Sequence, residues 1–217
     1  MDLEQARFNM VEQQVRPWSV LDSTVLQTMG DIPRDIFVPE SLISMAYADI
    51  EIPLDHNEFM MHPRVEGRML QELEIDITDE CLEVGTGSGY ITACMATMSK
   101  HVDSIDIYDS FLQSASEKLS KLNISNFKLE NKDALQSLNN PSKKYDVIAV
   151  TGSVPSYLPL FEELLKPNGR LFIVVGSKKI MHAMKVSREN DTFIRTTLYE
   201  AELNPLVGVE NKNAFSF

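Results

Sequence analysis

The fold of this 217-residue chain is decided by the stretch Glu80-Cys81-Leu82-Glu83-Val84-Gly85-Thr86-Gly87-Ser88-Gly89-Tyr90. A short apolar run ends here in three glycines at alternate positions, and a helix-like segment follows. Glycine lets the backbone turn tightly and lie close to a ligand, where a Cβ atom would collide. The stretch therefore predicts a strand whose C-terminal end meets a bound cofactor.

Glu83 indicates which cofactor this is, because it puts a carboxylate beside the glycine loop. A carboxylate repels a pyrophosphate and attracts a cationic ligand. The glycine spacing is also G-x-G-x-G, whereas dinucleotide-binding loops have G-x-G-x-x-G. Both observations favour S-adenosylmethionine, whose sulfonium and amino groups are positive.

The rest of the chain alternates between strand-like and helix-like segments. Strands are predicted over residues 80–84, 102–107, 126–130, 145–151 and 170–175, and helices over 90–98, 111–122 and 158–165. This alternation predicts a mostly parallel sheet with helices on both faces. Two more strand-like segments, 181–186 and 193–203, flank Asn190-Asp191 and predict an antiparallel hairpin at the sheet edge. We expect one domain over residues 1–217, with a helical, substrate-side extension (1–77) before an α/β core (78–217).

Ligands of open α/β sheets bind outside the carboxyl ends of the strands. Asp106 ends the second strand and can accept both ribose hydroxyls; Asp133 follows the third and can accept from the adenine amino group, with the Ala134 amide nearby. Thr151 ends the fourth strand and is expected to face the reactive end of the ligand. The alternative for both acids is a solvated surface residue. The predicted cofactor residues are Glu83, Gly85, Thr86, Gly87, Ser88, Gly89, Asp106, Ile107, Asp133, Ala134 and Thr151.

Composition excludes several classes of protein. The chain has 20 Lys and Arg against 32 Asp and Glu, a net charge of −12, which argues against a nucleic-acid binder. We expect no membrane span, because no run of about 18 apolar residues occurs. The acidic start predicts no secretory signal, and two cysteines in apolar segments fit a cytoplasmic protein. No His/Cys spacing suggests a metal site. A monomer is the simplest expectation, and a dimer stays open.

Several longer motifs match one known family. They are Met10-Val11-Glu12-x-Gln14, Ile32-Pro33-Arg34-x-x-Phe37-Val38-Pro39-Glu40, Ala46-Tyr47-x-Asp49, Leu82 to Tyr90, Ser104-Ile105-Asp106, Tyr145-Asp146-x-Ile148-x-Val150-Thr151, Leu165-Lys166-Pro167-x-Gly169-Arg170-Leu171 and Pro205-Leu206-Val207-Gly208. Across nearly the whole chain they resemble the protein-L-isoaspartate O-methyltransferases. The resemblance implies a Rossmann-like class I methyltransferase fold, with S-adenosylmethionine as methyl donor and S-adenosylhomocysteine as product. It also implies methylation of isoaspartyl carboxylates in damaged proteins, which is a protein repair reaction.

The chain departs from this family where the acceptor is expected. The family pattern after Pro-Leu is Gly-x-Gly-x-Thr-Ile/Val-Ser-x-Pro, whereas here the chain reads Pro53-Leu54-Asp55-His56-Asn57-Glu58-Phe59-Met60-Met61-His62-Pro63. Aligned on Pro63, Met61 stands at the active-site serine and Phe59 at the threonine. Positive charge from His56, His62 or Arg64 could replace the lost hydroxyl donors. Met61, His62 and Arg64 are accordingly the predicted catalytic segment.

Three hypotheses remain open from the sequence. The first is an isoaspartyl-repair methyltransferase with altered acceptor contacts, acting on a damaged protein or peptide. The second is a methyltransferase with another acceptor, for example a small molecule, in a more apolar pocket. The third is a cofactor-binding protein without turnover that acts through a partner.

Overall fold

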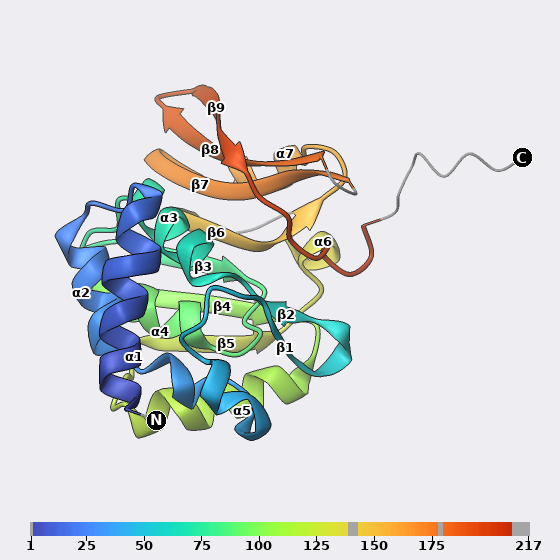
Figure 1. The fold of residues 1–217 in the computed structure, drawn as a ribbon. Helices are drawn as coiled ribbons and strands as arrows, with labels where there is room; N and C mark the ends of the chain where they lie inside the picture. Colours follow the sequence, from blue (N-terminus) through green and yellow to red (C-terminus); the bar gives the residue numbers. More distant parts are fainter. Residues whose placement is uncertain (1, 139–142, 178–179, 210–217) are drawn as a thin grey trace, which may run out of the picture.

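A seven-stranded sheet forms the centre of the molecule, in the order β5-β4-β3-β6-β7-β8-β9 (Figure 1). The structure is a computed structural model that describes residues 2–138, 143–177 and 180–209. The strands are β3 (Glu80–Val84), β4 (His101–Asp106), β5 (Phe127–Asn131), β6 (Tyr145–Val154), β7 (Leu165–Ser177), β8 (Ile180–Glu189) and β9 (Thr192–Glu200). Strands β3 to β7 pair in parallel, whereas β8 and β9 are antiparallel. The predicted parallel sheet with an antiparallel hairpin at its edge is therefore confirmed.

Helices cover both faces of the sheet, as its alternating strand residues require. In β6, Val147 and Ala149 pack in one hydrophobic cluster, and Ile148 and Val150 pack in another. The first cluster includes residues of α4 (Tyr90–Met98) and α5 (Asp109–Lys121). The second includes Phe161 of α7 (Pro159–Glu162), and the short α6 (Ala134–Ser137) packs against it. In the part of the chain that the structure describes, no helix has the length and apolar character needed to cross a membrane.

Several predicted elements differ in length from the observed ones; the strands expected over 145–151, 170–175 and 181–186, for example, are all longer. The helix expected over 158–165 is only the four residues of α7, because Leu165 already pairs with Tyr145 in the sheet. Pairing with β6 satisfies the backbone there, whereas so short a helix has little stability of its own. The strand expected over 193–203 ends at Glu200. The chain then turns back toward the end of β6, where the Ser153 amide donates to the Asn204 carbonyl at 2.7 Å.

The N-terminal part wraps one side of the sheet and reaches the carboxyl ends of its strands (Figure 1). Its main helices are α1 (Leu3–Met10), α2 (Ser23–Asp31) and α3 (Pro63–Glu72); a π-helical turn (Val11–Val15) and 3-10 turns (Arg16–Trp18, Arg34–Ile36, Glu40–Met45, Asp55–Asn57) complete it. Strands β1 (Ile52–Pro53) and β2 (Phe59–Met60) form a small hairpin. Residues of this part share the first hydrophobic cluster with the sheet, so a continuous core joins the two. The boundary expected near residue 77 stays a prediction of the sequence.

A buried ion pair between Arg34 and Glu66 anchors the segment that precedes α3. The two side chains are 0% and 2% exposed, with Nε of Arg34 3.1 Å from Oε2 of Glu66. Arg34 also donates to the carbonyls of Ala46 and Met61, both at 2.7 Å. Burial raises the pKa of Glu66, and the adjacent guanidinium opposes that rise. The arginine thus fixes the backbone of Met61, the residue at the family's serine position.

We expect Arg34→Met to lower the free energy of unfolding by about 3–5 kcal/mol, because it leaves a buried carboxylate without its partner. Urea unfolding measures this loss. The matched control is Arg16→Met, which breaks a pair with Glu12 whose side chains are 45% and 34% exposed. Removal of such a surface pair costs at most about 1 kcal/mol. Equal losses in the two variants would contradict the anchoring role.

Candidate cofactor and acceptor site

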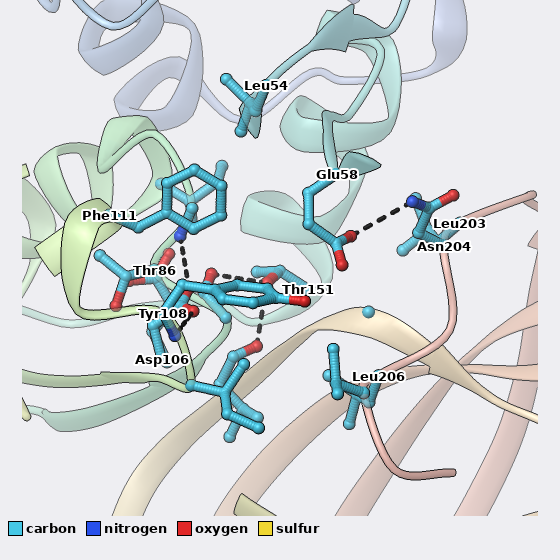
Figure 2. A pocket seen from close by; sticks show the side chains of 18 of the residues that line it. Leu54, Glu58, Thr86, Asp106, Tyr108, Phe111, Thr151, Leu203, Asn204 and Leu206 are labelled. Carbon is cyan, nitrogen blue, oxygen red and sulfur yellow. Dashed lines mark hydrogen bonds between the residues drawn. The ribbon is translucent and has the colours of Figure 1, made fainter. Parts of the chain in front are cut away.

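A pocket lies at the carboxyl ends of β3, β4 and β6 (Figure 2). The glycine loop lines it, together with residues that follow β4 and β5, the hairpin β1–β2 and residues 203–207. All the predicted cofactor residues except Gly89 line this pocket. Gly89 instead precedes α4 with φ +88°, and a Cβ there would lie 2.8 Å from Cβ of Ala115. It therefore serves the packing of α4 on α5.

The first residue of the glycine loop, Gly85, must also be a glycine. Gly85 has φ +101°, a conformation that side chains rarely adopt. A Cβ atom there would collide with Oγ1 of Thr151. That hydroxyl donates to the carbonyls of Val84 and Gly85, at 2.9 and 2.8 Å. Thr151 thus lines the pocket as predicted, but its hydrogen is directed at the backbone of the loop and not at a ligand.

Glu83 presents a buried acceptor atom to the pocket. Its Oε2 atom accepts from the hydroxyls of Thr92 and Ser104, both at 2.5 Å. Its Oε1 atom is buried and has no hydrogen-bond partner among the described residues. Burial raises the pKa of this carboxyl to about 8, although both hydroxyls oppose the rise. A cationic amino group, such as that of S-adenosylmethionine, fits this vacant acceptor.

Asp106 connects the end of β4 to the glycine loop. Its Oδ2 atom accepts from the Gly87 amide and its Oδ1 atom from the Tyr108 amide, both at 2.9 Å. Burial raises the pKa of Asp106, and these backbone hydrogen bonds oppose the rise. The Ile107 amide is a third donor to this carboxylate, and a carboxylate has about four acceptor positions, so about one remains for a ribose hydroxyl.

Asp133 caps the short helix α6 just after β5, the strand that pairs with β4. Its Oδ1 atom accepts from the Leu135 amide at 2.9 Å, and its Oδ2 atom from Nε2 of Gln136 at 2.7 Å. Ile107 and Ala134 line the pocket beside it. The predicted adenine contact therefore falls on a side chain that also starts a helix, with acceptor capacity remaining on both oxygens.

The predicted catalytic segment is divided by the structure. Met61 is buried and lines the pocket, whereas His62 and Arg64 do not line it. Nδ1 of His62 lies 2.9 Å from the carbonyl oxygen of Asp49. Arg64 forms an ion pair with the Asp49 carboxylate and stacks on Trp18, with Cζ 4.6 Å from the ring centre. Its charge is thus engaged away from the pocket, so the geometry does not support its holding an acceptor carboxylate.

Sequence reasoning missed the acids at the acceptor end. Glu51 precedes β1 and Glu58 lies in the turn before β2, and both line the pocket beside Phe59, Met60 and Met61. Burial raises the pKa of Glu51, and repulsion from Glu202 adds to the rise. Glu58 accepts from Nδ2 of Asn204 at 3.2 Å (Figure 2). No local motif marks these residues, because they meet only when distant segments fold together. Across the described ranges, no cluster of His, Cys, Asp or Glu is placed to hold a metal ion.

A parallel sheet with a glycine loop beside a buried carboxylate defines the class I methyltransferase fold. A solved protein-L-isoaspartate O-methyltransferase from Plasmodium falciparum, in complex with S-adenosyl-L-homocysteine, shares this fold with a TM-score of 0.80. It is 22% identical, with 92% of this chain and 97% of that chain covered.

Two relatives are closer in sequence, and both are named protein-L-isoaspartate O-methyltransferase. The one from Aliivibrio fischeri is 31% identical over 94% of this chain and 98% of its own. The one from Petrotoga mobilis is 33% identical over 88% and 90%. The family model described as protein-L-isoaspartate(D-aspartate) O-methyltransferase matches residues 5–211. The chain therefore belongs to this family.

The buried Glu83 predicts that cofactor binding releases a proton. Near pH 7 a carboxyl whose pKa is about 8 is mostly protonated, and a cationic amino group on Oε1 favours its charged form and lowers that pKa. We expect S-adenosylhomocysteine to release up to about one proton at pH 7 and to bind more tightly as the pH rises toward 8. Calorimetry in two buffers of different ionisation enthalpy measures the release.

Glu83→Gln is the matched variant for this measurement, since it keeps the shape and removes the titrating group. The release should be absent in the variant. An equal release from both proteins assigns the proton to another group and contradicts the prediction.

Proposed function

We propose that this chain transfers a methyl group from S-adenosylmethionine to the carboxylate of isoaspartyl residues in damaged proteins, and so takes part in protein repair. The match of residues 5–211 to the isoaspartyl methyltransferase family carries the proposal. The pocket supports it, because the residues predicted to hold the cofactor line one cavity beside Met61. A cytoplasmic location and a monomeric state stay predictions of the sequence.

Bound S-adenosylmethionine supplies a methyl group on a sulfonium, which passes to a carboxylate oxygen as the carbon–sulfur bond breaks and its electron pair stays on a neutral thioether. A carboxylate is already a nucleophile, so no residue has to remove a proton. The protein contributes position and exclusion of water. Glu83 would hold the amino group of the donor and Asp106 its ribose, and Met60 and Met61 provide an apolar, buried surface at the acceptor end.

A second candidate is methyl transfer to a different acceptor, and a specific observation favours it. The acceptor end presents the carboxylates of Glu51 and Glu58 beside Phe59, Met60 and Met61. This combination of negative charge and apolar surface favours a neutral or cationic small molecule over a carboxylate.

One labelling experiment tests the proposed function. The protein is incubated with methyl-labelled S-adenosylmethionine and an isoaspartyl peptide, and the normal aspartyl peptide of the same sequence is the control. Base-labile label on the isoaspartyl peptide alone is the expected result, because methyl esters hydrolyse in base. Labelling at the rate of the buffer blank would sink the repair function and leave the second candidate.

Glu58→Gln tests the electrostatics of the acceptor end. It removes a like charge, and the glutamine oxygen can still accept from Asn204. We expect the KM for the isoaspartyl peptide to fall about fivefold, equivalent to about 1 kcal/mol, which is the interaction of two charges about 4 Å apart in water.

The control for this substitution is Glu117→Gln, on the exposed surface of α5, which should leave the KM unchanged. A higher KM in Glu58→Gln would contradict this prediction, because it would mean that the Glu58 carboxylate attracts the acceptor.

A further inference from the structure

Three aromatic rings form a cluster at the pocket. The rings of Tyr108 and His56 are stacked, with centroids 4.0 Å apart and planes at 1°. Phe111 meets both edge-on, at 5.7 Å from Tyr108 and 5.4 Å from His56. Nε2 of His56 also lies 2.9 Å from Oγ of Ser110. The ring of Tyr108 is therefore held between α5 and the segment that carries His56.

This cluster joins the cofactor end of the pocket to its acceptor end. Tyr108 follows Asp106 by two residues, and its amide donates to the Asp106 carboxylate. His56 lies in the turn between β1 and β2, where it precedes Glu58 and Phe59. The backbone of Tyr108 thus lies on the cofactor side of the pocket, and its stacking partner His56 belongs to the segment on the acceptor side.

The hydroxyl of Tyr108 is a free donor inside the pocket. Figure 2 shows the ring extending into the pocket space. Two other donors of the lining are engaged: Thr151 donates to the glycine loop, and Asn204 donates to the Asn57 carbonyl and to Glu58. Lys132 pairs with Glu130 at 3.0 Å. Two tyrosine hydroxyls of the described pocket lining have no hydrogen-bond partner: that of Tyr90, in α4, is fully buried, whereas Tyr108 is only half-buried and can be reached from the pocket space.

We propose that the Tyr108 hydroxyl donates a hydrogen bond to the acceptor carboxylate and so determines specificity for it. This inference rests on the proposed function. Phe59 and Met61 offer no hydroxyl, and Glu51 and Glu58 repel a carboxylate, so the acceptor needs a donor from elsewhere in the pocket. Tyr108 supplies that donor from the end of β4, and His56 is a positioning residue that sets the plane of its ring.

The principal test is Tyr108→Phe, which removes the hydroxyl and keeps the stacked ring. We expect the KM for an isoaspartyl peptide to rise about 10- to 100-fold, the effect of one hydrogen bond to a charged group. The bond is already made to the carboxylate of the ground state, so kcat should change less than about twofold. Calorimetric titration of the peptide into protein saturated with S-adenosylhomocysteine should show the same loss of affinity.

The matched control is Tyr199→Phe. Its hydroxyl likewise has no hydrogen-bond partner in the described structure, although it is buried, and Tyr199 lies in β9 and does not line the pocket. This variant should leave the KM for the peptide and the affinity for S-adenosylhomocysteine unchanged. The affinity for S-adenosylhomocysteine should also be unchanged in Tyr108→Phe.

His56→Ala separates positioning from general damage in a double-mutant cycle. If the histidine acts through the tyrosine hydroxyl, the His56→Ala substitution raises the KM for the peptide in the wild-type background and has little further effect in the Tyr108→Phe background. Equal effects in both backgrounds would remove the positioning role.

The results that overturn the inference are distinct from failure of the proposed function. An unchanged peptide KM in Tyr108→Phe overturns the acceptor contact. A weaker affinity for S-adenosylhomocysteine with an unchanged peptide affinity assigns the hydroxyl to the cofactor and also overturns it. Absence of label from wild-type protein on any isoaspartyl peptide overturns the proposed function itself, and the inference with it.

Discussion

The buried carboxylate of Glu83 is the interaction on which the site depends. It lies one residue before the end of β3, accepts from Ser104 of β4 and Thr92 of α4, and so ties two neighbouring strands and a helix together at the carboxyl ends of the strands. Burying a charged group is costly unless it is paired, and its raised pKa records that cost. One oxygen of this buried group has no partner among the described residues. A cationic amino group bound there, as we propose for the cofactor, would offset the cost of burial and couple binding to the stability of the strand ends.

The glycine loop and Asp106 extend this arrangement along the donor's length. Positive φ values at Gly85 and Gly87 bring the backbone to the pocket, and the Asp106 carboxylate holds the Gly87 amide in place. Both features lie in one strand–loop–helix unit and its neighbouring strand. The donor half of the pocket is therefore built from local structure, which explains why it follows the family pattern closely.

The acceptor half is assembled differently. Arg34, far from the pocket in sequence, fixes the Met61 backbone. The rings of His56 and Tyr108 stack although the two residues are 52 positions apart in the chain. Asn204 returns from the end of β9 to bind Glu58, at a separation of 146 residues. Substitution of the family's hydroxyl residues by Phe59 and Met61 thus changes a surface to which four separate segments contribute. Such a surface can regain a donor from another segment, as the placement of Tyr108 illustrates.

The sequence by itself determined the parallel sheet, the hairpin at its edge, the class of cofactor and nearly all of the residues that line its end of the pocket. Glycine spacing, strand–helix alternation and acids at strand ends are local constraints, and local patterns record them. Only the tertiary structure decided that Arg64 pairs with Asp49 away from the pocket, that the Thr151 hydroxyl serves the backbone, and that Glu51, Glu58 and Tyr108 line the same pocket as Met61. Those placements depend on which distant segments pack together, and the direction of a side chain at such a junction leaves no periodic signal in the chain.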